Sequence, residues 1–189
     1  AGDKRRAVGK GGDHPVGGPA AEQLRGPVSG PLSGMAVDVV GVAVARVHER
    51  GGRAAAVTAG MSLTGLRATN FSSGQGIAYM HESLYAAVGK RLTYVLNIGA
   101  RAMTKATLNV HAGHDDYHCV DDTGFFQLFA ANAQQAADLN IIAHRIAELA
   151  LTPGIVAQDG FLTTHLIESL LVPERELIAE YLGRPDDII

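Results

Sequence analysis

The stretch "LTYVLNIGARAMT" (residues 92–104) decides the predicted fold. Its centre is a continuous apolar run without strict alternation of polar and apolar residues, which is typical of a strand covered on both faces, as in parallel sheets. Polar and charged residues follow directly, beginning at Arg101. The stretch therefore predicts a buried strand that opens into a polar loop.

Strands and helices are predicted to alternate around this stretch, because short apolar runs that end in turn residues are followed by segments with helical periodicity. Such alternation predicts an α/β fold in which a mostly parallel sheet is flanked by helices. The predicted strands are 66–71, 91–100, 124–130 and 154–160, and the predicted helices are 77–89, 133–151 and 173–183.

The predicted helices carry signals at their ends. Gly89 suits the C-terminal cap of the first helix, and Asn132 with Gln135 suits the N-terminal cap of the second. Pro173 and Gly183 mark the start and the end of the last helix. The second helix is expected to have one apolar stripe, which consists of Leu139, Ile142, Ile146 and Leu149.

The first fifty residues differ from the rest. Residues 1–34 hold nine glycines and four prolines, a composition that cannot bury enough apolar surface to offset the entropy of ordering, so a tail or linker is predicted. The domain is expected to span 35–189. Residues 35–50, "MAVDVVGVAVARVHER", are rich in valine, but their length favours a buried helix over a single strand.

Composition narrows the classes of protein and partner. The net charge is −3 and the lysines and arginines are scattered along the 189 residues, so nucleic acid is not an expected partner. The single cysteine, Cys119, excludes an internal disulfide framework and indicates a reducing compartment, the cytoplasm. No run reaches the roughly 18 apolar residues of a membrane span.

Three polar segments follow predicted strands, namely 72–76 ("SSGQG"), 99–118 and 158–165 ("QDGFLTTH"). In open parallel sheets, ligands sit beyond the carboxyl ends of the strands. The second segment is much longer than the usual connection of about four to six residues, and long loops are commonly functional. These segments are therefore the candidate site.

From Ala54 to its end, the chain resembles the N-terminal, pyrimidine-binding domain of 2-oxoacid:ferredoxin oxidoreductases, such as pyruvate:ferredoxin oxidoreductase. Each motif alone is weak, but the ordered set is specific. The matching segments are "AAAVTAGMSLTGLRATNFSSGQG", "LTYVLNIGARAMT", "GHDDYHCVDDTGF" and "AQDGFLTTH".

The resemblance implies a thiamine-diphosphate-binding fold, with the cofactor and its magnesium shared with a partner domain. Arg101 falls where the family binds the carboxylate of the 2-oxoacid, and a guanidinium offers a charged planar fork for that purpose. The turn of Ser72, Ser73, Gly74 and Gln75 falls beside the aminopyrimidine, although a plain strand-to-helix turn would also explain these residues.

Two positions depart from the family pattern. Gly51 stands where family members carry a glutamate that holds the aminopyrimidine in its reactive tautomer. Glu49, two residues away, is the candidate to serve instead. The opening strand and "YPITPS"-like turn of the family have no match in residues 1–50, so the first strand–turn unit is expected to be missing or replaced.

The segment "NVHAGHDDYHCVDD" (109–122) allows three interpretations: a metal site, a loop ordered around cofactor or partner, or a solvated connector. His111, His114 and His118 have spacings that could serve zinc on a helix, but no zinc signature such as HExxH is present. The resemblance implies a loop near the active site and the domain interface, with His114 and Asp116 at the matching positions and no metal. It places His165 at the rim.

The first functional hypothesis is a domain or subunit of a thiamine-diphosphate-dependent 2-oxoacid:ferredoxin oxidoreductase, which oxidatively decarboxylates a 2-oxoacid such as pyruvate. The resemblance implies partner subunits in an oligomer, iron–sulfur clusters on those partners and a ferredoxin-like acceptor. The chain alone should be inactive, because it shows neither a Gly-Asp-Gly magnesium motif nor cluster cysteines. The alternatives are a catalytically silent assembly subunit and, third, a metal hydrolase that uses the histidine segment.

Overall fold

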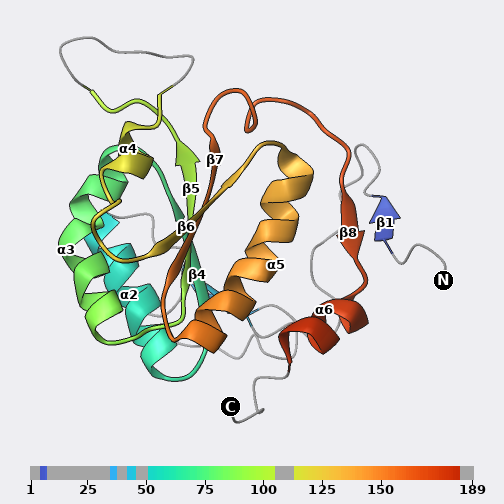
Figure 1. Ribbon diagram of the computed structural model, residues 1–189, viewed down its shortest axis with the longest axis horizontal. Coiled ribbons are helices and arrows are strands. Elements are labelled where there is room, and N and C mark those ends of the chain that lie inside the picture. Colours follow the sequence, from blue (N-terminus) through green and yellow to red (C-terminus); the bar gives the residue numbers. More distant parts are fainter. Residues whose placement is uncertain (1–4, 8–34, 38–41, 46–50, 105–112, 184–189) are drawn as a thin grey trace.

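The computed structural model describes residues 5–7, 35–37, 42–45, 51–104 and 113–183. A six-stranded sheet runs through its centre (Figure 1). The strand order is β2-β3-β4-β5-β7-β6, in which only β2 is antiparallel to its neighbour. The strands are β2 (Met35–Val37), β3 (Val42–Ala45), β4 (Arg67–Ser72), β5 (Val95–Ala100), β6 (Phe126–Ala130) and β7 (Gly154–Asp159).

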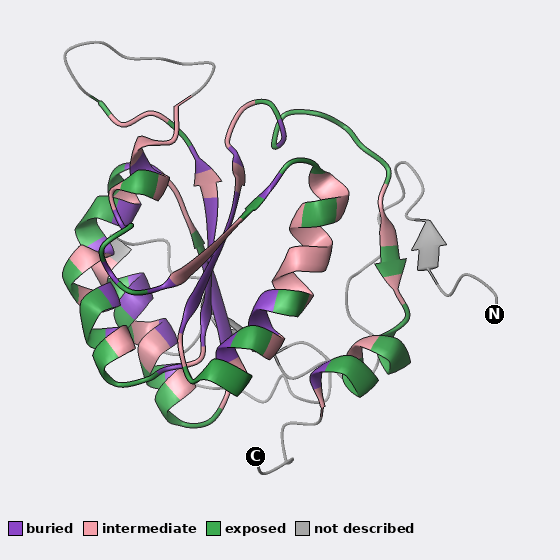
Figure 2. Cartoon of the chain, in the orientation of Figure 1, coloured by how far each residue is buried: buried purple, intermediate pink, exposed green. Residues whose placement is uncertain are grey.

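Helices cover both faces of the sheet (Figure 1). Helices α2 (Gly51–Leu63) and α3 (Gln75–Gly89) pack on one face, and α5 (Ala133–Ala150) packs on the other against β5, β6 and β7. The central strands are buried, whereas the outward sides of the helices are exposed (Figure 2). The predicted α/β fold with a mostly parallel sheet is confirmed.

The main core lies between the sheet and the pair α2–α3. Tyr94, Leu96 and Ile98 from the β5 segment are fully buried against Ile77 and Leu84 of α3. On the opposite face a smaller cluster joins β5 and β7 to α5. The buried strand predicted from the apolar run is therefore covered on both faces, as expected.

The chain ends with two elements beside this sheet. Strand β8 (Leu171–Pro173) precedes α6 (Arg175–Leu182), and it pairs antiparallel with β1 (Arg5–Ala7). Residues 5–7 of the predicted tail or linker thus pair with the open edge of β8 through backbone hydrogen bonds, while the domain boundary stays a prediction. The other residues of 1–34 lie outside the described part of the chain.

The prediction of a buried helix over 35–50 is wrong. Met35–Val37 and Val42–Ala45 form strands β2 and β3, because β-branched valine favours a strand and antiparallel pairing supplies the backbone hydrogen bonds. Strand β3 runs parallel to β4 and precedes α2. Strand β3 thus lies in the region where the first strand–turn unit of the family is expected to be missing or replaced.

The predicted cap of one helix is wrong and that of another is confirmed. Helix α3 ends in a Schellman pattern in which Arg91, not Gly89, takes the left-handed conformation (φ 55°), and Leu92 N–H donates to Ala87 O at 3.1 Å. Helix α5 begins as predicted, since the Asn132 side chain accepts a hydrogen bond from the N–H of Gln135 at 2.9 Å.

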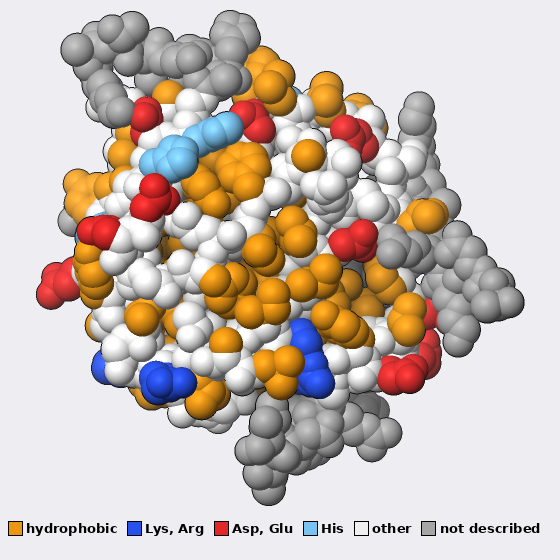
Figure 3. Space-filling model, viewed as in Figure 1, with side chains coloured by type: hydrophobic (Ala, Val, Ile, Leu, Met, Phe, Trp, Pro, Cys, Tyr) orange, Lys and Arg blue, Asp and Glu red, His pale blue; other side chains and the backbone are white. Residues whose placement is uncertain are grey.

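The apolar stripe predicted for α5 matches its buried face only at Leu139, which packs against the smaller core cluster. Ile142, Ile146 and Leu149 are exposed, whereas Ala143, His144 and Ala147 are buried against the sheet. Small residues allow the helix to approach the strands closely, so the larger apolar side chains point outward. Apolar side chains accordingly gather over α5 on the molecular surface (Figure 3). None of the described helices is long and apolar enough to cross a membrane.

Asn70 on β4 is a buried exception to the rule that polar groups find partners. Its side chain is 1% exposed, and neither amide atom has a hydrogen-bond partner in the described part of the chain. An unsatisfied buried amide costs about 1–3 kcal/mol. We therefore expect Asn70→Val to raise the free energy of unfolding by about 1–2 kcal/mol in urea titrations, because valine also favours strands.

Asn97 on the neighbouring strand β5 is the matched control. Its amide donates to Thr69 Oγ1 at 2.8 Å and accepts from Asn140 Nδ2 at 2.7 Å. Asn97→Val should lower the free energy of unfolding, because it strands both partners. If Asn70→Val also lowers it, the amide of Asn70 is satisfied in solution and the prediction is wrong.

Candidate active site

The loops that follow β4, β5 and β7 meet at the carboxyl edge of the sheet (Figure 1). The N–H of Gly160, after β7, donates to Ala100 O at the end of β5 at 2.6 Å. The N–H of Gly74, after β4, donates to the carboxylate of Asp116 at 2.6 Å. The described parts of the three polar segments are thus in contact with one another.

Arg101 is the exposed cation of this edge. Its guanidinium lies against Gly74, where an added Cβ would come within 2.6 Å of Nε and of Nη2. Gly74 also has φ +57°, a conformation that other residues rarely adopt. No hydrogen bond or ion pair joins the guanidinium to another described residue. A guanidinium is a fork of N–H donors that suits an anion.

The turn of Ser72, Ser73, Gly74 and Gln75 connects β4 to α3 and lies beside Arg101. Ser72 and Ser73 are half-buried, Gly74 is buried and Gln75 is exposed. Gln75 Nε2 donates to Thr104 Oγ1 at 3.0 Å and so links the turn to the segment after β5. The turn therefore lies beside Arg101, and Arg101 with this turn is called the candidate anion site. Contact of the turn with a cofactor stays a prediction.

Asp116 belongs to the short helix α4 (Asp115–His118) and is completely buried. Its carboxylate accepts hydrogen bonds from the backbone N–H groups of Gly74 (2.6 Å), Arg101 (2.9 Å) and Tyr117 (2.8 Å). Such charge-assisted bonds satisfy a carboxylate in a buried place. Asp116 therefore shapes the site from within and does not present its side chain to a ligand.

His114 joins α4 to the loop after β7. Its Nε2 lies 2.8 Å from Asp159 Oδ2, and its ring packs 4.9 Å from the ring of Phe129. Burial of Asp159 opposes its ionisation, but hydrogen bonds from His114, Leu162 and Phe161 outweigh that effect and hold the pKa of the carboxyl below its usual value. The ionised form of Asp159 is thus the form that the fold stabilises.

This pKa shift sets a pH dependence. Since the folded-state pKa lies below the unfolded value of about 3.9, Asp159 stabilises the fold above about pH 4, and the contribution is lost as the pH falls through the folded-state pKa. The free energies of unfolding of the parent and Asp159→Asn in urea should differ at neutral pH and converge as the pH falls through the folded-state pKa of Asp159. A difference that does not change with pH would count against this role.

His165 and Cys119 lie at the margins of the site. His165 is exposed after β7, with its ring 5.0 Å from that of Phe161, which is consistent with a place at the rim. The thiol of Cys119 donates to Asp116 O, and burial together with the neighbouring acids raises its pKa. A raised thiol pKa disfavours a thiolate nucleophile at neutral pH.

The histidines of segment 109–122 do not converge in the described part of the chain. His114 pairs with Asp159, whereas the exposed His118 pairs with Asp121 at 3.1 Å between Nδ1 and Oδ2. Histidine side chains lie over α4 on the surface (Figure 3). No group of three potential metal ligands is found among the described residues, which exclude His111.

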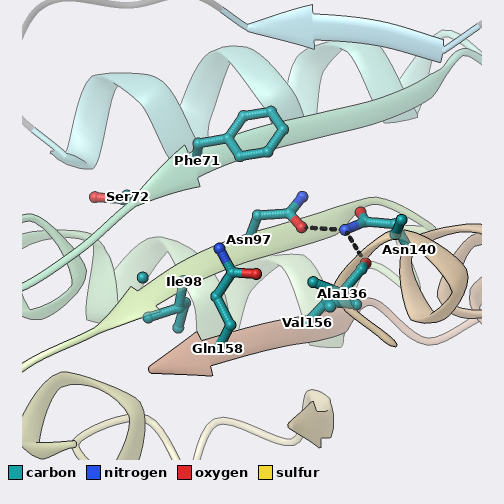
Figure 4. A pocket seen from close by; sticks show the side chains of 10 residues that line it. Phe71, Ser72, Asn97, Ile98, Ala136, Asn140, Val156 and Gln158 are labelled. Atoms are coloured by element: carbon teal, nitrogen blue, oxygen red, sulfur yellow. Dashed lines mark hydrogen bonds between the residues drawn. The ribbon is translucent and has the colours of Figure 1, made fainter. Parts of the chain in front are cut away.

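A cavity of about 260 Å³ opens at the carboxyl ends of β4, β5 and β7, on the side of α5. Its polar groups are neutral, and Figure 4 shows the Asn97 side chain hydrogen-bonded to Asn140 of α5, with Gln158 projecting into the cavity from the neighbouring strand. Phe71, 64% exposed, forms an aromatic edge. The sequence prediction included Gln158, in segment 158–165, but not Phe71, Asn97 or Asn140, although an asparagine within the apolar run 94–98 is a usable signal.

Glu49, the candidate acid–base residue, lies outside the described residues, so its role stays a prediction. Gly51, at the position of the family's glutamate, is the first residue of α2. Helix α2 follows the parallel strand β3, whose carboxyl end lies next to that of β4 in the sheet.

Comparisons with known proteins agree with the resemblance. Residues 33–187 match the family model described as pyruvate flavodoxin/ferredoxin oxidoreductase, thiamine diP-binding. The pyruvate synthase subunit PorA of Pyrococcus abyssi is 39% identical over 126 residues, which cover 66% of this chain and 32% of the relative. The pyruvate-flavodoxin oxidoreductase of Klebsiella pneumoniae is 34% identical over 132 residues, which cover 70% and 11% respectively. The chain thus spans about a third or less of these curated relatives.

The fold has a solved counterpart as well. A 2-oxoglutarate:ferredoxin oxidoreductase from Magnetococcus marinus, with 2-oxoglutarate, coenzyme A and succinyl-CoA bound, superimposes with a TM-score of 0.56 at 20% identity. The superposition covers 75% of this chain and 24% of the other and bears on the fold. Because the family model matches most of the chain, this protein belongs to the thiamine-diphosphate-binding family of pyruvate flavodoxin/ferredoxin oxidoreductases.

Proposed function

We propose that the chain is the pyrimidine-side domain of a thiamine-diphosphate-dependent 2-oxoacid:acceptor oxidoreductase, with pyruvate as the first substrate to test. The named relatives are subunits or parts of pyruvate-oxidising enzymes. Since the chain covers only part of their length, the other functional modules are assigned to the rest of the assembly. These are the magnesium and diphosphate site, the iron–sulfur clusters and the docking site of a ferredoxin-like acceptor.

The observation that carries the proposal is the available guanidinium of Arg101 at the carboxyl edge of β5. Its backbone N–H is held by Asp116, and its side chain lies in the space that Gly74 leaves open. A fixed guanidinium binds a carboxylate through two parallel hydrogen bonds and orients it. Arg101 would thus hold the substrate carboxylate and direct the adjacent keto carbon toward the cofactor.

The chemistry of the donor set fits the uncharged aminopyrimidine end of thiamine diphosphate. Besides Arg101, the described polar groups near this edge include neutral hydroxyls and amides, from Ser72, from Gln75, whose Nε2 donates to Thr104, and from Gln158. The described carboxylates at this edge, Asp115, Asp116 and Asp159, are already engaged by backbone N–H donors or by His114. A dianionic diphosphate with magnesium needs oxygen ligands, which the proposal assigns to a partner module.

This donor set suggests which steps belong to the cofactor and which to the residues of this chain. When bound, the cofactor supplies the carbanionic carbon that adds to the keto group and the electron sink for loss of carbon dioxide. This chain binds the substrate carboxylate through Arg101 and lines the pyrimidine side of the cleft with the turn 72–75. Glu49 is proposed to exchange the proton at the aminopyrimidine. The cytoplasm is the proposed setting, since a reducing compartment keeps Cys119 a free thiol.

The experiment is reconstitution of the full-length protein with its partner subunits, followed by an assay for reduction of a low-potential dye that depends on 2-oxoacid, thiamine diphosphate and magnesium. Turnover with pyruvate would support the proposal. An intact, cofactor-loaded assembly without turnover on pyruvate or 2-oxoglutarate would favour a catalytically silent assembly subunit.

A further inference from the structure

We propose that Asp116 is a positioning residue for Arg101 and that it makes this site selective for a carboxylate-bearing substrate. The inference rests on the proposed function, because it assigns to Asp116 the placement of the group that binds the 2-oxoacid. Asp116 itself is fully buried and has no path to substrate, so its effect must pass through the backbone that it holds.

The carboxylate of Asp116 joins its own helix, α4, to two loops that are distant from it in sequence. Oδ2 accepts from Gly74 N–H at the end of the β4 turn, 42 residues away. Oδ1 accepts from Arg101 N–H, 15 residues away, and from Tyr117 N–H within α4. The two loops that form the candidate anion site are therefore tied to one side chain, with one oxygen for each loop.

The geometry makes the two bonds to the loops interdependent. The guanidinium of Arg101 occupies the space directly above the Cα of Gly74, within 2.6 Å of where a Cβ would stand. A shift of either backbone segment by a few tenths of an ångström would move the guanidinium against the turn. Asp116 fixes both segments at once, and so it sets the direction in which the fork of Arg101 points.

Neighbouring groups of the same segment reinforce this role. Asp115 Oδ2 accepts from Met103 N–H at 3.0 Å, so the chain just after Arg101 is also held by α4. His114 holds Asp159, the last residue of β7, from which the third loop begins. Residues 114–116 thus contact all three loops of the carboxyl edge, and Asp116 is the member that contacts both segments of the candidate anion site.

Asparagine at position 116 is the informative change, because it keeps the shape and removes one acceptor. An amide has one oxygen and an NH2 group, so one of the two loop N–H groups would face another donor. In the reconstituted holoenzyme we expect Asp116→Asn to raise the KM for pyruvate about tenfold, which corresponds to ~1.4 kcal/mol of lost binding. The inhibition constant of pyruvamide, which has no carboxylate, should stay within about twofold.

A merely structural role predicts a different result. It would lower the amount of active enzyme or kcat and leave the ratio of the pyruvate KM to the pyruvamide inhibition constant unchanged, and that outcome would overturn the proposal. Asp121→Asn is the matched control, since this exposed acid of the same segment contacts His118 and not the loops of the site. It should leave the ratio as in the parent enzyme.

Hydrogen exchange in the parent enzyme tests the proposal without any variant, so the result does not depend on whether a substituted protein folds. In the parent holoenzyme, hydrogen exchange followed by mass spectrometry should show slow exchange at the amides of Gly74 and Arg101, because Asp116 accepts from both. Unprotected exchange at both amides would overturn the positioning role. If the parent enzyme does not turn over 2-oxoacids but both amides are protected, the proposed function fails while the geometry on which the inference rests is intact.

Discussion

Arg101→Ala is expected to lower kcat/KM for pyruvate in the reconstituted enzyme by about 150-fold. The change removes a fork of two charge-assisted hydrogen bonds to the substrate carboxylate, and a loss of about 3 kcal/mol of transition-state binding is the usual size of such an effect. The guanidinium makes no hydrogen bond or ion pair to another described residue, so the fold should tolerate the change. Steady-state dye reduction measures the first effect, and thermal unfolding measures the second.

Arg101→Lys separates charge from geometry. Lysine keeps the positive charge but offers no planar fork, so this variant should recover only part of the lost activity. Wild-type kcat/KM in Arg101→Ala would contradict the proposed role, and the candidate anion site would then have to lie elsewhere in the assembly.

Of the substitutions considered, Arg67→Ala should destabilise the fold most, lowering the free energy of unfolding by about 3–5 kcal/mol. The side chains of Arg67 on β4 and Glu148 on α5 are only 8% and 13% exposed and form an ion pair across the sheet–helix interface. The same guanidinium donates to the carbonyl oxygens of Leu182 and Gly183 at the end of α6. Alanine would leave a buried carboxylate and two carbonyl groups without their donor.

Urea unfolding followed by circular dichroism would measure this loss. Arg175→Ala is a suitable control, because Arg175 is an exposed arginine at the start of α6, and its removal should change stability by less than about 0.5 kcal/mol. Equal effects of the two substitutions would show that the interface between β4, α5 and α6 does not depend on Arg67.

The central strands and their helices could be predicted from the sequence because they are built from local patterns. The apolar run before Arg101 marks β5, and turn residues mark the ends of β4 and β7. The cap formed by Asn132 and Gln135 is also local, since both residues lie within one turn of α5. Patterns of this kind are complete within a few residues and need no knowledge of tertiary contacts.

The failures share a different cause. Helix was preferred over strand for 35–50 on length alone, whereas antiparallel pairing divides the region into β2 and β3. The apolar stripe of α5 is expected to face the core, but Ala143, His144 and Ala147 are the buried residues of the helix, and Leu139 is the member of the stripe that packs on the core. Packing distance between layers decides such cases, and a single sequence does not display it.

The residues of the candidate site also fall into those that the sequence predicts and those that only the tertiary structure reveals. The resemblance pointed to Arg101 and to the turn at Gly74, and the structure brings these residues into contact. The role of Asp116 could not be read from its neighbours in the sequence, because its partners lie 15 and 42 residues away. The neutral cavity that includes Asn97 and Asn140 was missed for the same reason, as these residues are 43 positions apart.

The close approach of Gly74 and Arg101 has a consequence for redesign of substrate range. A Cβ at position 74 and the observed guanidinium would compete for one volume, so the two positions form a single unit of substitution. A library aimed at uncharged aldehydes or ketones should vary both codons together, because shortening the arginine frees the volume for a side chain at 74, while the positive φ of that position (+57°) still favours residues that tolerate the left-handed region, such as asparagine.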